Sequence, residues 1–539
     1  MSNTLTSIAQ VPEHAIAAGL GAGRNVIARD ADRVLFSEVG ARAVGLLQGT
    51  KEGLRLAART FRTGEPSDAV TKVEAQSQRA ISGRKGELIR LPMRALSAED
   101  ELFKGMARRM ELSGLAVREA AKEGLRGSEA RQRAAELLAN PTDSMVDRSL
   151  DYARYLTFQR PLGEAGRHIS GFTNRYPAAK LFMPFVRTPA NLLKFALERS
   201  PAAPLLKEWR ADMMAGGARR DLAAAKAMVG TGAMMLVAQL AAEGHITGSG
   251  PADDGARNLM RADGWQPYSV KVGDTYYSYA RLDPFSTTLG VMADMVGLQE
   301  HMTEKQRDDV AQLVVASALG NLANKTWLSG ISDLTDAIRD PERYGDNLVQ
   351  KLVGSAVVPA GVAQVARTTD PTLREVETVL DAVKARTPGL SKTLEPRRDV
   401  WGEPIVNSGS AGPDLVSPIW ASTAKGDPTI AALLSAGAHV TAPQRKVGGR
   451  ELTGSEYGAY AERTGELLKP ELRALIQSAK WKALDDEGRQ EAVSKANSAA
   501  KREARAELFE AQGAAVTSSA RRPARAVDQW STFANAPSR

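Results

Sequence analysis

The sequence predicts a mainly α-helical protein: an elongated bundle of many helices with a small β-hairpin insertion and an irregular arm rich in glycine and proline. Apolar residues recur every three or four positions over most of the 539-residue chain, which is the spacing of one helix face. Alanine is abundant and aromatic residues make up only 5% of the chain, so we expect helices packed closely through small side chains. The signal for β-structure is confined to one short stretch.

The N-terminal half is predicted to consist of successive helices. Residues 12–62 predict a helical hairpin that ends where Gly64 and Pro66 stop the pattern. The motif Ser97-Ala98-Glu99-Asp100 resembles a capping box, so a second helical region is expected to begin there. Two further helices are expected on either side of Asn140-Pro141, over residues 128–139 and 142–158.

A β-hairpin is predicted in the middle of the chain. Segments 265–272 and 275–281 flank Gly273-Asp274, a two-residue turn with glycine first. Its tyrosines either pack across the strands, which is the favoured interpretation, or stack on nucleic-acid bases. They are Tyr268, Tyr276, Tyr277 and Tyr279.

The C-terminal half is predicted to be less regular. Residues 386–450, rich in Gly, Pro and Ser, predict an extended irregular arm. A capping box at Thr453-Gly454-Ser455-Glu456 and the charged, Ala-rich stretch 485–510 predict C-terminal helices. The apolar runs 310–324 and 352–366 are too short for confident membrane spans and predict buried helices.

These signals divide the chain into six regions. They are an N-terminal helical region, a helical bundle with a basic region and an apolar helix, a region of hairpin plus helices, the irregular arm, the C-terminal helices and a disordered basic tail. Their bounds are 1–95, 96–250, 251–385, 386–450, 451–512 and 513–539.

The motifs indicate a protein that is not an enzyme and that holds no cofactor or metal. The chain has no cysteine, which excludes disulfides and Cys-based zinc sites. Its five histidines are scattered, and the Asp253-Asp254 pair supplies too few ligands for a specific cation site. The segment 19–23 has the glycines of a phosphate loop but neither a preceding strand nor a Gly-Lys-Ser/Thr ending. No secretory signal is visible at the N-terminus, so synthesis in a cytoplasm is expected.

The most apolar stretch, residues 222–242, approaches the length needed to span a bilayer. Lys226 and Gln239 interrupt it, Arg219-Arg220 precede it and Glu243 follows it, as in a positive-inside segment. It predicts either a buried bundle helix or a segment that enters a membrane at some stage. The candidate membrane residues are Leu222, Met228, Met234, Met235, Leu236 and Leu240.

Most of the chain's net charge of +8 lies between residues 151 and 220, where 12 basic residues face five acidic ones. The region predicts either a solvated face or a contact with an anionic partner, lipid or DNA. The candidate contacts are Arg187, Lys194, Arg199, Arg210, Arg219 and Arg220.

Three phrases carry a resemblance to known proteins. They are GELIRLPMRALSAEDELFK at 86–104, FMPFVRTPANLLKFALER at 182–199, and GWQPY at 264–268 together with YARLDP at 279–284. The chain resembles tailed-bacteriophage internal virion or DNA-ejection proteins and the related non-enzymatic regions of large phage polyvalent proteins. The resemblance covers roughly residues 35–300 and, more loosely, 450–510.

The resemblance implies a protein made in the host cytoplasm and placed in the virion, inside the capsid or at the portal or tail. Such proteins leave with the genome and build a conduit across the host cell envelope. The implied partners are other virion proteins (ejection proteins, portal or tail), further copies of the chain, the host inner membrane and phage DNA. Larger relatives also carry wall-cutting enzymes, for which this sequence shows no motif. The alternative is a virion core, scaffold or tail-associated protein that is never ejected.

Overall fold

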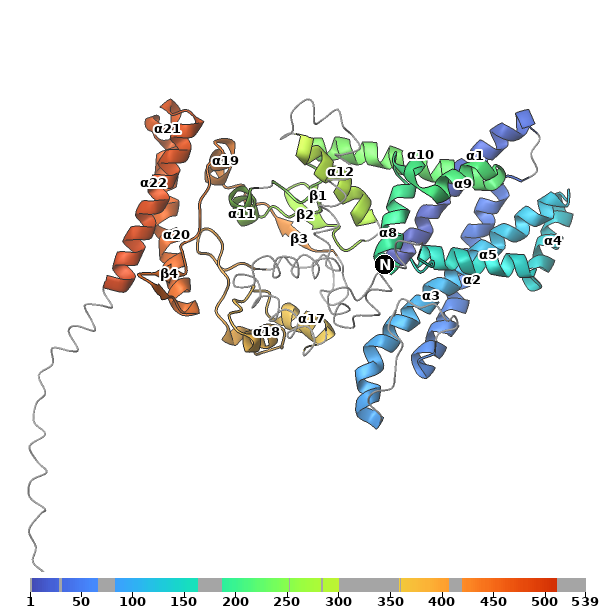
Figure 1. Cartoon of the computed structure of the whole chain (residues 1–539), viewed down its shortest axis with the longest axis horizontal. Helices are drawn as coiled ribbons and strands as arrows, with labels where there is room; N and C mark the ends of the chain where they lie inside the picture. Colours follow the sequence, from blue (N-terminus) through green and yellow to red (C-terminus); the bar gives the residue numbers. More distant parts are fainter. Residues whose placement is uncertain are drawn as a thin grey trace, which may run out of the picture. The chain divides into compact units, whose positions relative to one another are not determined.

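The computed structural model describes residues 2–28, 32–65, 83–162, 187–251, 253–282, 285–299, 358, 360–406 and 419–510. Figure 1 shows helices through most of these ranges and a few short strands, which confirms the mainly α-helical prediction. The chain divides into two compact units. Unit 1 comprises residues 1–250, 267–273 and 277–348, and unit 2 comprises residues 251–266, 274–276 and 349–539.

Unit 1 is built from helices that pack through small side chains. Helix α10 contacts α1, α8, α9 and α12, and α3 contacts α2, α4 and α5. Where α1 meets α10, the core includes Ala17, Ala18, Ala218 and Ala225, as the composition predicted. The helices are α1 (Ser2–Ala28), α2 (Phe36–Thr63), α3 (Gly83–Lys122), α4 (Gly127–Ala139), α5 (Asp143–Leu156), α8 (Arg187–Glu198), η1 (Ala203–Leu205), α9 (Lys207–Ala215), α10 (Gly217–Ala242) and α12 (Phe285–Gln299).

Helices α2 and α3 approach each other through glycine. Gly45, Gly49 and Gly53 recur every four residues and therefore lie on one face of α2. A Cβ atom at Gly49 would lie 2.8 Å from the Cα of Met106 in α3, and one at Gly45 would lie 2.8 Å from the Cβ of Ser113. No side chain fits in such a gap, so the backbones of the two helices are in direct contact.

The motif at Ser97 does not begin a helix. Helix α3 begins at Gly83 and passes through Ser97 without a break. The predicted start was wrong because the helix continues upstream of Ser97 in spite of Pro92, and a single serine costs a helix interior little. The bounds of α4 and α5 agree with the sequence prediction to within two residues, and α1 and α2 pack together as a hairpin.

The predicted β-hairpin is present. Strands β1 (Ser269–Val272) and β2 (Thr275–Ser278) are joined at Gly273, whose φ of +58° is the positive value that the first residue of such a turn needs. The strand order is β1-β2-β3. Strand β3 (Ala421–Thr423) comes from far along the chain, and beside it the Ala424 amide donates to the Asp274 carbonyl at 2.7 Å. This third strand was not predicted.

Unit 2 has its own apolar core, in which α20 and α22 pack together. The predicted capping box starts α20: the Thr453 hydroxyl accepts from the Glu456 amide at 3.3 Å, and the Glu456 carboxylate accepts from the Thr453 amide at 2.9 Å. Short strands β4 (Lys446–Val447) and β5 (Arg450–Glu451) pair antiparallel. The helices are α11 (Asp254–Ala262), α17 (Ala360–Thr369), α18 (Val379–Ala385), η2 (Ser391–Thr393), α19 (Pro428–Ser435), α20 (Gly454–Gln477), α21 (Ala479–Ala483), α22 (Asp486–Arg505) and the π-helical turn η3 (Ala506–Glu510).

The stretch 386–450 is more ordered than its composition predicted. Its described residues include α19, β3 and β4. Trp401, Leu433 and Val440 are buried in the same cluster as Leu468 of α20. The glycines and prolines serve tight turns such as the one at Gly402 (φ +73°), which passes close to the Ala461 carbonyl.

Some predicted features lie outside the described residues. They are the apolar run 310–324, residues 352–357 and 359 of the run 352–366, the C-terminal tail 513–539, and three basic residues of the 151–220 region, Arg167, Arg175 and Lys180. The rest of the run 352–366 is Val358 and the start of α17.

We predict that Gly49→Val lowers the free energy of unfolding by about 1–3 kcal/mol, because the new side chain meets the α3 backbone at Met106. Gly40→Ala is the matched control in the same helix, since nothing lies within 4 Å of a Cβ there. That change should raise stability by about 0.5–1 kcal/mol through helix propensity. Urea unfolding followed by circular dichroism measures both, and a Gly49→Val protein as stable as Gly40→Ala contradicts the proposed backbone contact.

Candidate functional site

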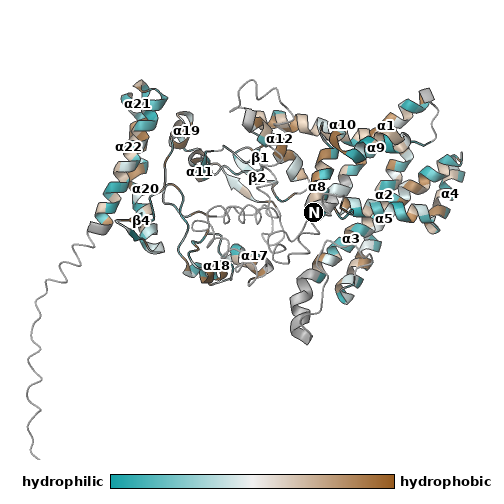
Figure 2. Cartoon of the chain, viewed as in Figure 1, coloured by the Kyte–Doolittle hydropathy of each residue, from teal (hydrophilic) through white to brown (hydrophobic). Residues whose placement is uncertain are grey.

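Helix α10 has the length and composition of a membrane span. Among the described residues it is the single helix that is long and apolar enough to cross a bilayer. Figure 2 shows hydrophobic colouring along much of α10 and α12, in contrast to the hydrophilic α22. Core helices of soluble proteins can have the same composition. The exposure of the side chains of α10 distinguishes a core helix from a helix with an apolar outer surface.

Helix α10 buries mostly small side chains, together with Met234 and Val237, and exposes three large apolar ones. Alanines and a glycine point into the bundle: Ala218, Ala223, Ala225 and Gly230 are buried. The larger Met228, Met235 and Leu236 are 54%, 68% and 58% exposed. A core helix normally buries its large side chains and exposes its polar ones. Helix α10 therefore presents an apolar surface outward.

The other predicted membrane residues face the bundle. Met234 is buried, and Leu222 and Leu240 are half-buried. Leu222 packs against the buried cluster that includes Ala17 and Ala18 of α1. Leu240 packs against the cluster that includes Tyr279 of the hairpin. The structure thus separates the six predicted residues into an outward and an inward set.

Close backbone approaches fix α10 against its neighbours. Gly230 lies so near the carbonyl of Arg199 that a Cβ atom there would overlap it. The indole of Trp209 in α9 donates a hydrogen bond to the Ala223 carbonyl at 3.1 Å. Glycine and alanine are therefore needed on this face for geometric reasons.

Two charges of α10, the buried Asp221 and the half-buried Lys226, bind partners on other helices. Asp221 accepts from Arg24 of α1 at 2.5 Å. Lys226 donates to Glu198 of α8 at 3.1 Å and to the Tyr155 hydroxyl of α5 at 2.9 Å. Breaking such a pair by removing one partner leaves an uncompensated buried charge. The two contacts hold α10 to three different helices.

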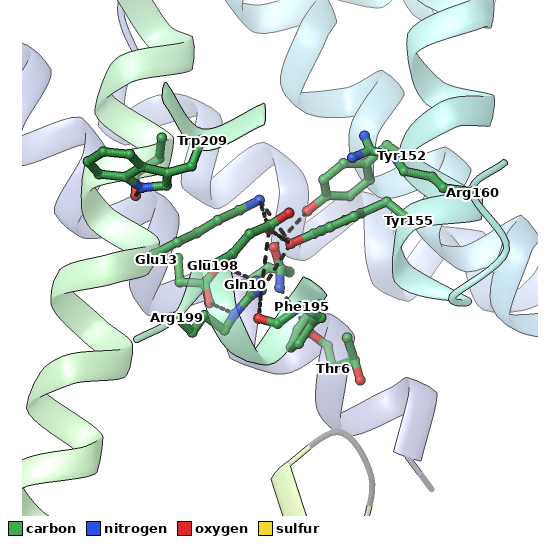
Figure 3. Close-up of polar contacts among 12 residues, drawn as sticks. Thr6, Gln10, Glu13, Tyr152, Tyr155, Arg160, Phe195, Glu198, Arg199 and Trp209 are labelled. Atoms are coloured by element: carbon green, nitrogen blue, oxygen red, sulfur yellow. Dashed lines mark hydrogen bonds and ion pairs between the residues drawn. The ribbon is translucent and has the colours of Figure 1, made fainter. Parts of the chain in front are cut away.

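A second buried ion pair lies beside Lys226. Figure 3 shows Glu13 of α1, Tyr155 of α5, and Glu198 and Arg199 at the end of α8 converging on one point. Arg199 donates to both carboxylate oxygens of Glu13, at 2.7 and 2.9 Å, and to the Tyr155 hydroxyl at 2.9 Å. The Tyr155 hydroxyl donates in turn to Glu198 at 2.5 Å.

The electrostatics keep the Glu198 carboxylate charged. Burial alone would raise the pKa of Glu198, but Lys226 and Arg199 outweigh burial and hold that pKa below its ordinary value. Burial raises the pKa of Tyr155, so its hydroxyl stays protonated and can donate. The cluster is a fully paired polar core rather than an acid–base pair poised to exchange protons.

The α2–α3 hairpin contains a similar network. Glu38 accepts from Arg42 at 3.2 Å and from Arg118 Nε at 3.0 Å, and Arg42 also donates to Glu111. The four residues are buried. Burial would raise the pKa of Glu111, yet Arg42 lowers it below its usual range. Ion pairs therefore run through the whole bundle.

Most of the predicted anionic-partner contacts are already engaged. Arg199 is only 6% exposed and binds Glu13, so it does not lie on the surface as predicted. Lys194 pairs with Glu208 at 2.5 Å, Arg219 pairs with Asp212, and Arg210 donates to the Pro204 carbonyl at 2.7 Å. Arg187 is partly buried at the start of α8, and Arg220 is partly buried in α10. The structure does not gather the six residues into one patch.

The remaining candidate groups have structural partners. Tyr279 is buried and meets Tyr268 edge to face at 6.3 Å, in agreement with packing inside the hairpin. Asp253 caps α11 by accepting from the Ala256 amide at 2.6 Å. Within the described part of the chain, no group of three His, Asp or Glu residues is placed to hold a metal.

Unit 2 contains a surface cavity of about 370 Å³, next to Trp401 and α20. Two ion pairs border it: Lys469 donates to Glu403 at 2.9 Å, and Glu462 binds Arg398 at 3.0 Å.

Comparison of the chain with protein-family models, with curated proteins and with solved structures finds no match.

The buried networks were missed at the sequence level because their members lie far apart in the chain. Glu13 and Arg199 are 186 positions apart, and Arg24 and Asp221 are 197 apart. The sequence feature that could have indicated these networks is the presence of charged residues among apolar ones. These residues are Asp221 and Lys226 in α10 and Glu38 and Arg42 in α2. A charged residue on an otherwise apolar helix face predicts a buried partner without identifying it.

We predict that Arg199→Met lowers the free energy of unfolding of unit 1 by about 3–5 kcal/mol, because it removes the guanidinium that binds both carboxylate oxygens of the buried Glu13. The double variant Glu13→Met/Arg199→Met should recover most of that loss. Lys194→Met in the same helix is the control, since its exposed pair should contribute at most about 1 kcal/mol. Chemical unfolding of the four proteins provides the comparison, and a double variant as unstable as the single one contradicts the interpretation.

We also predict a loss of unit 1 stability as the pH falls from 7.5 to 5.5. Burial lowers the pKa of His14 well below its ordinary value of about 6.5, and Arg42, Arg118 and Lys226 lower it further. Below about pH 6.5 the unfolded chain therefore binds a proton at His14 that the folded chain does not bind. The contribution of neutral, buried His14 to the free energy of unfolding is present above about pH 6.5 and is lost as the pH falls below it.

His14→Gln should remove this dependence, because its amide can still donate to the Gln10 carbonyl that His14 contacts at 2.8 Å. The depressed pKa values of Glu111 and Glu198 keep both carboxylates charged across this range. Urea midpoints of the two proteins at both pH values are the measurement. Equal shifts in the two proteins would exclude His14 as the cause.

Proposed function

We propose that the chain is an internal virion protein of a tailed phage, ejected with the genome, and that it helps to form a conduit across the host cell envelope. In this proposal α10 is the segment that enters the bilayer. The observation that carries it is the outward face of a helix of spanning length, formed by Met228, Met235 and Leu236. The three phrases that resemble ejection proteins support the same assignment.

The geometry of α10 suits insertion after a rearrangement. The uncharged run from residue 227 to residue 242 is about 24 Å of helix at 1.5 Å per residue, short of the hydrocarbon thickness of about 30 Å. Lys226, Arg220 and Arg219 precede the run. Long basic side chains at a helix end can reach the headgroups, which extends the usable span.

Insertion requires that the buried ion pairs of α10 come apart. Asp221 must leave Arg24, and Lys226 must leave Glu198 and Tyr155. In water these pairs hold the helix in the bundle. At an anionic membrane the basic groups would find new partners in the lipid phosphates, so the same charges serve both states.

We predict that Met235→Arg abolishes leakage of dye from vesicles of phosphatidylglycerol and phosphatidylcholine. An arginine near the middle of the bilayer costs about 2.5–3.5 kcal/mol, which reduces the inserted fraction roughly a hundredfold. Because Met235 is exposed, the variant should fold normally. Met214→Arg, at an exposed methionine outside α10, is the matched control and should leak like the wild type.

Lys226→Met should act in the opposite direction. It leaves Glu198 without its lysine partner, which loosens α10, and it extends the uncharged run to residues 222–242, about 31 Å. Leakage should therefore rise. Leakage that is unchanged in both Met235→Arg and Lys226→Met argues for the alternative, a virion core, scaffold or tail-associated protein that is never ejected.

A further inference from the structure

Helix α2 carries a second outward apolar surface, separate from α10. Phe36, Val44, Leu47, Leu54 and Phe61 are 63%, 53%, 76%, 56% and 44% exposed. At about 100° per residue, all but Val44 fall within an arc of roughly 40°. They form a straight ridge along the helix, which we call the α2 ridge.

The α2 ridge faces away from the bundle because the opposite face of α2 is committed to α3. Gly45, Gly49 and Gly53 lie against the α3 backbone, and Glu38 and Arg42 bind α3 through buried ion pairs. The helix therefore buries its smallest and its charged side chains and exposes its largest apolar ones. Rotating α2 to bury the ridge would break both sets of contacts.

Basic side chains border the ridge along one side. Lys51, Arg55, Arg59 and Arg62 are exposed, and none of them forms an ion pair with any residue in the described part of the chain. The one acidic residue among them, Glu52, is bound to Arg109 at 3.6 Å. The exposed side of α2 is thus both apolar and strongly positive.

This charge decides between possible occupants of the ridge. A second copy of the chain, docked ridge to ridge, would bring these basic residues close to their own counterparts, which is repulsive. A negatively charged partner would satisfy them. A convex ridge of Phe and Leu bordered by Lys and Arg is the pattern of helices that lie in the headgroup region of anionic membranes.

We propose that the α2 ridge docks on an anionic lipid surface, with Leu47, Leu54 and Phe61 entering the acyl boundary and the bordering cations contacting lipid phosphates. The helix remains packed on α3 while it does so. This contact is peripheral and does not rest on insertion of α10, so it can be present whether or not the chain forms a conduit.

The test is flotation of the full chain with vesicles of phosphatidylglycerol and phosphatidylcholine, compared with vesicles of phosphatidylcholine alone. Wild type should float with the anionic vesicles and lose binding as salt rises. Leu47→Glu/Leu54→Glu and, separately, Arg55→Glu/Arg59→Glu/Arg62→Glu should each weaken binding more than tenfold. Val26→Glu, at an exposed valine of α1, is the matched control and should bind like the wild type.

The outcomes separate this inference from the proposed function. Met235→Arg should lose leakage but still float, because only α10 is affected. If both α2 variants float like the wild type, or if the chain binds neutral and anionic vesicles equally, the ridge is not a contact for anionic lipid and the proposal is overturned. If no vesicle binds the folded chain, an acidic protein surface replaces lipid as the occupant and the proposal is overturned.

Discussion

Buried ion pairs between helices determine how unit 1 is held together. Glu13–Arg199, Asp221–Arg24 and Lys226–Glu198 connect α1, α8 and α10, and the Glu38, Arg42 and Arg118 network connects α2 to α3. Apolar contacts between large side chains are non-directional and could form in many relative positions of the helices. Each of these ion pairs, in contrast, forms in only one relative position. Desolvation offsets much of their attraction. The network therefore contributes a defined arrangement of helices more than it contributes stability.

The same network explains why large apolar side chains remain outside. In α2, charged groups and glycines occupy the inward face and leave leucine and phenylalanine on the outward face, and in α10 Met228, Met235 and Leu236 are left outside while Met234 is buried. Exposed apolar surface on this scale usually marks a binding surface. The two surfaces differ in charge: the cations that border the α2 ridge form no ion pair with the described residues, while most of those near α10 are paired.

The sequence predicted local structure well and long-range structure poorly. The turn at Gly273, the capping box at Thr453 and the helix break at Pro141 were predicted correctly because each depends on neighbouring residues. The start of α3 was missed because a capping motif was compatible with a helix interior. The partner of Arg199 lies 186 residues away, and no local pattern identifies it. The α2 ridge needed the structure, since only the contact with α3 shows which face of the helix is left outside.

Lys226 has opposite effects on the packing of α10 in the bundle and on its insertion into a bilayer. Inside the bundle its charge holds the helix by binding Glu198 and Tyr155, whereas inside a bilayer the same charge opposes insertion. Its position resolves the conflict, because it follows Arg219 and Arg220 near the N-terminal end and precedes the uncharged run. An inserted α10 could keep all three basic groups at one headgroup layer. A charge at position 235 could not be placed in this way, and the helix there carries a methionine.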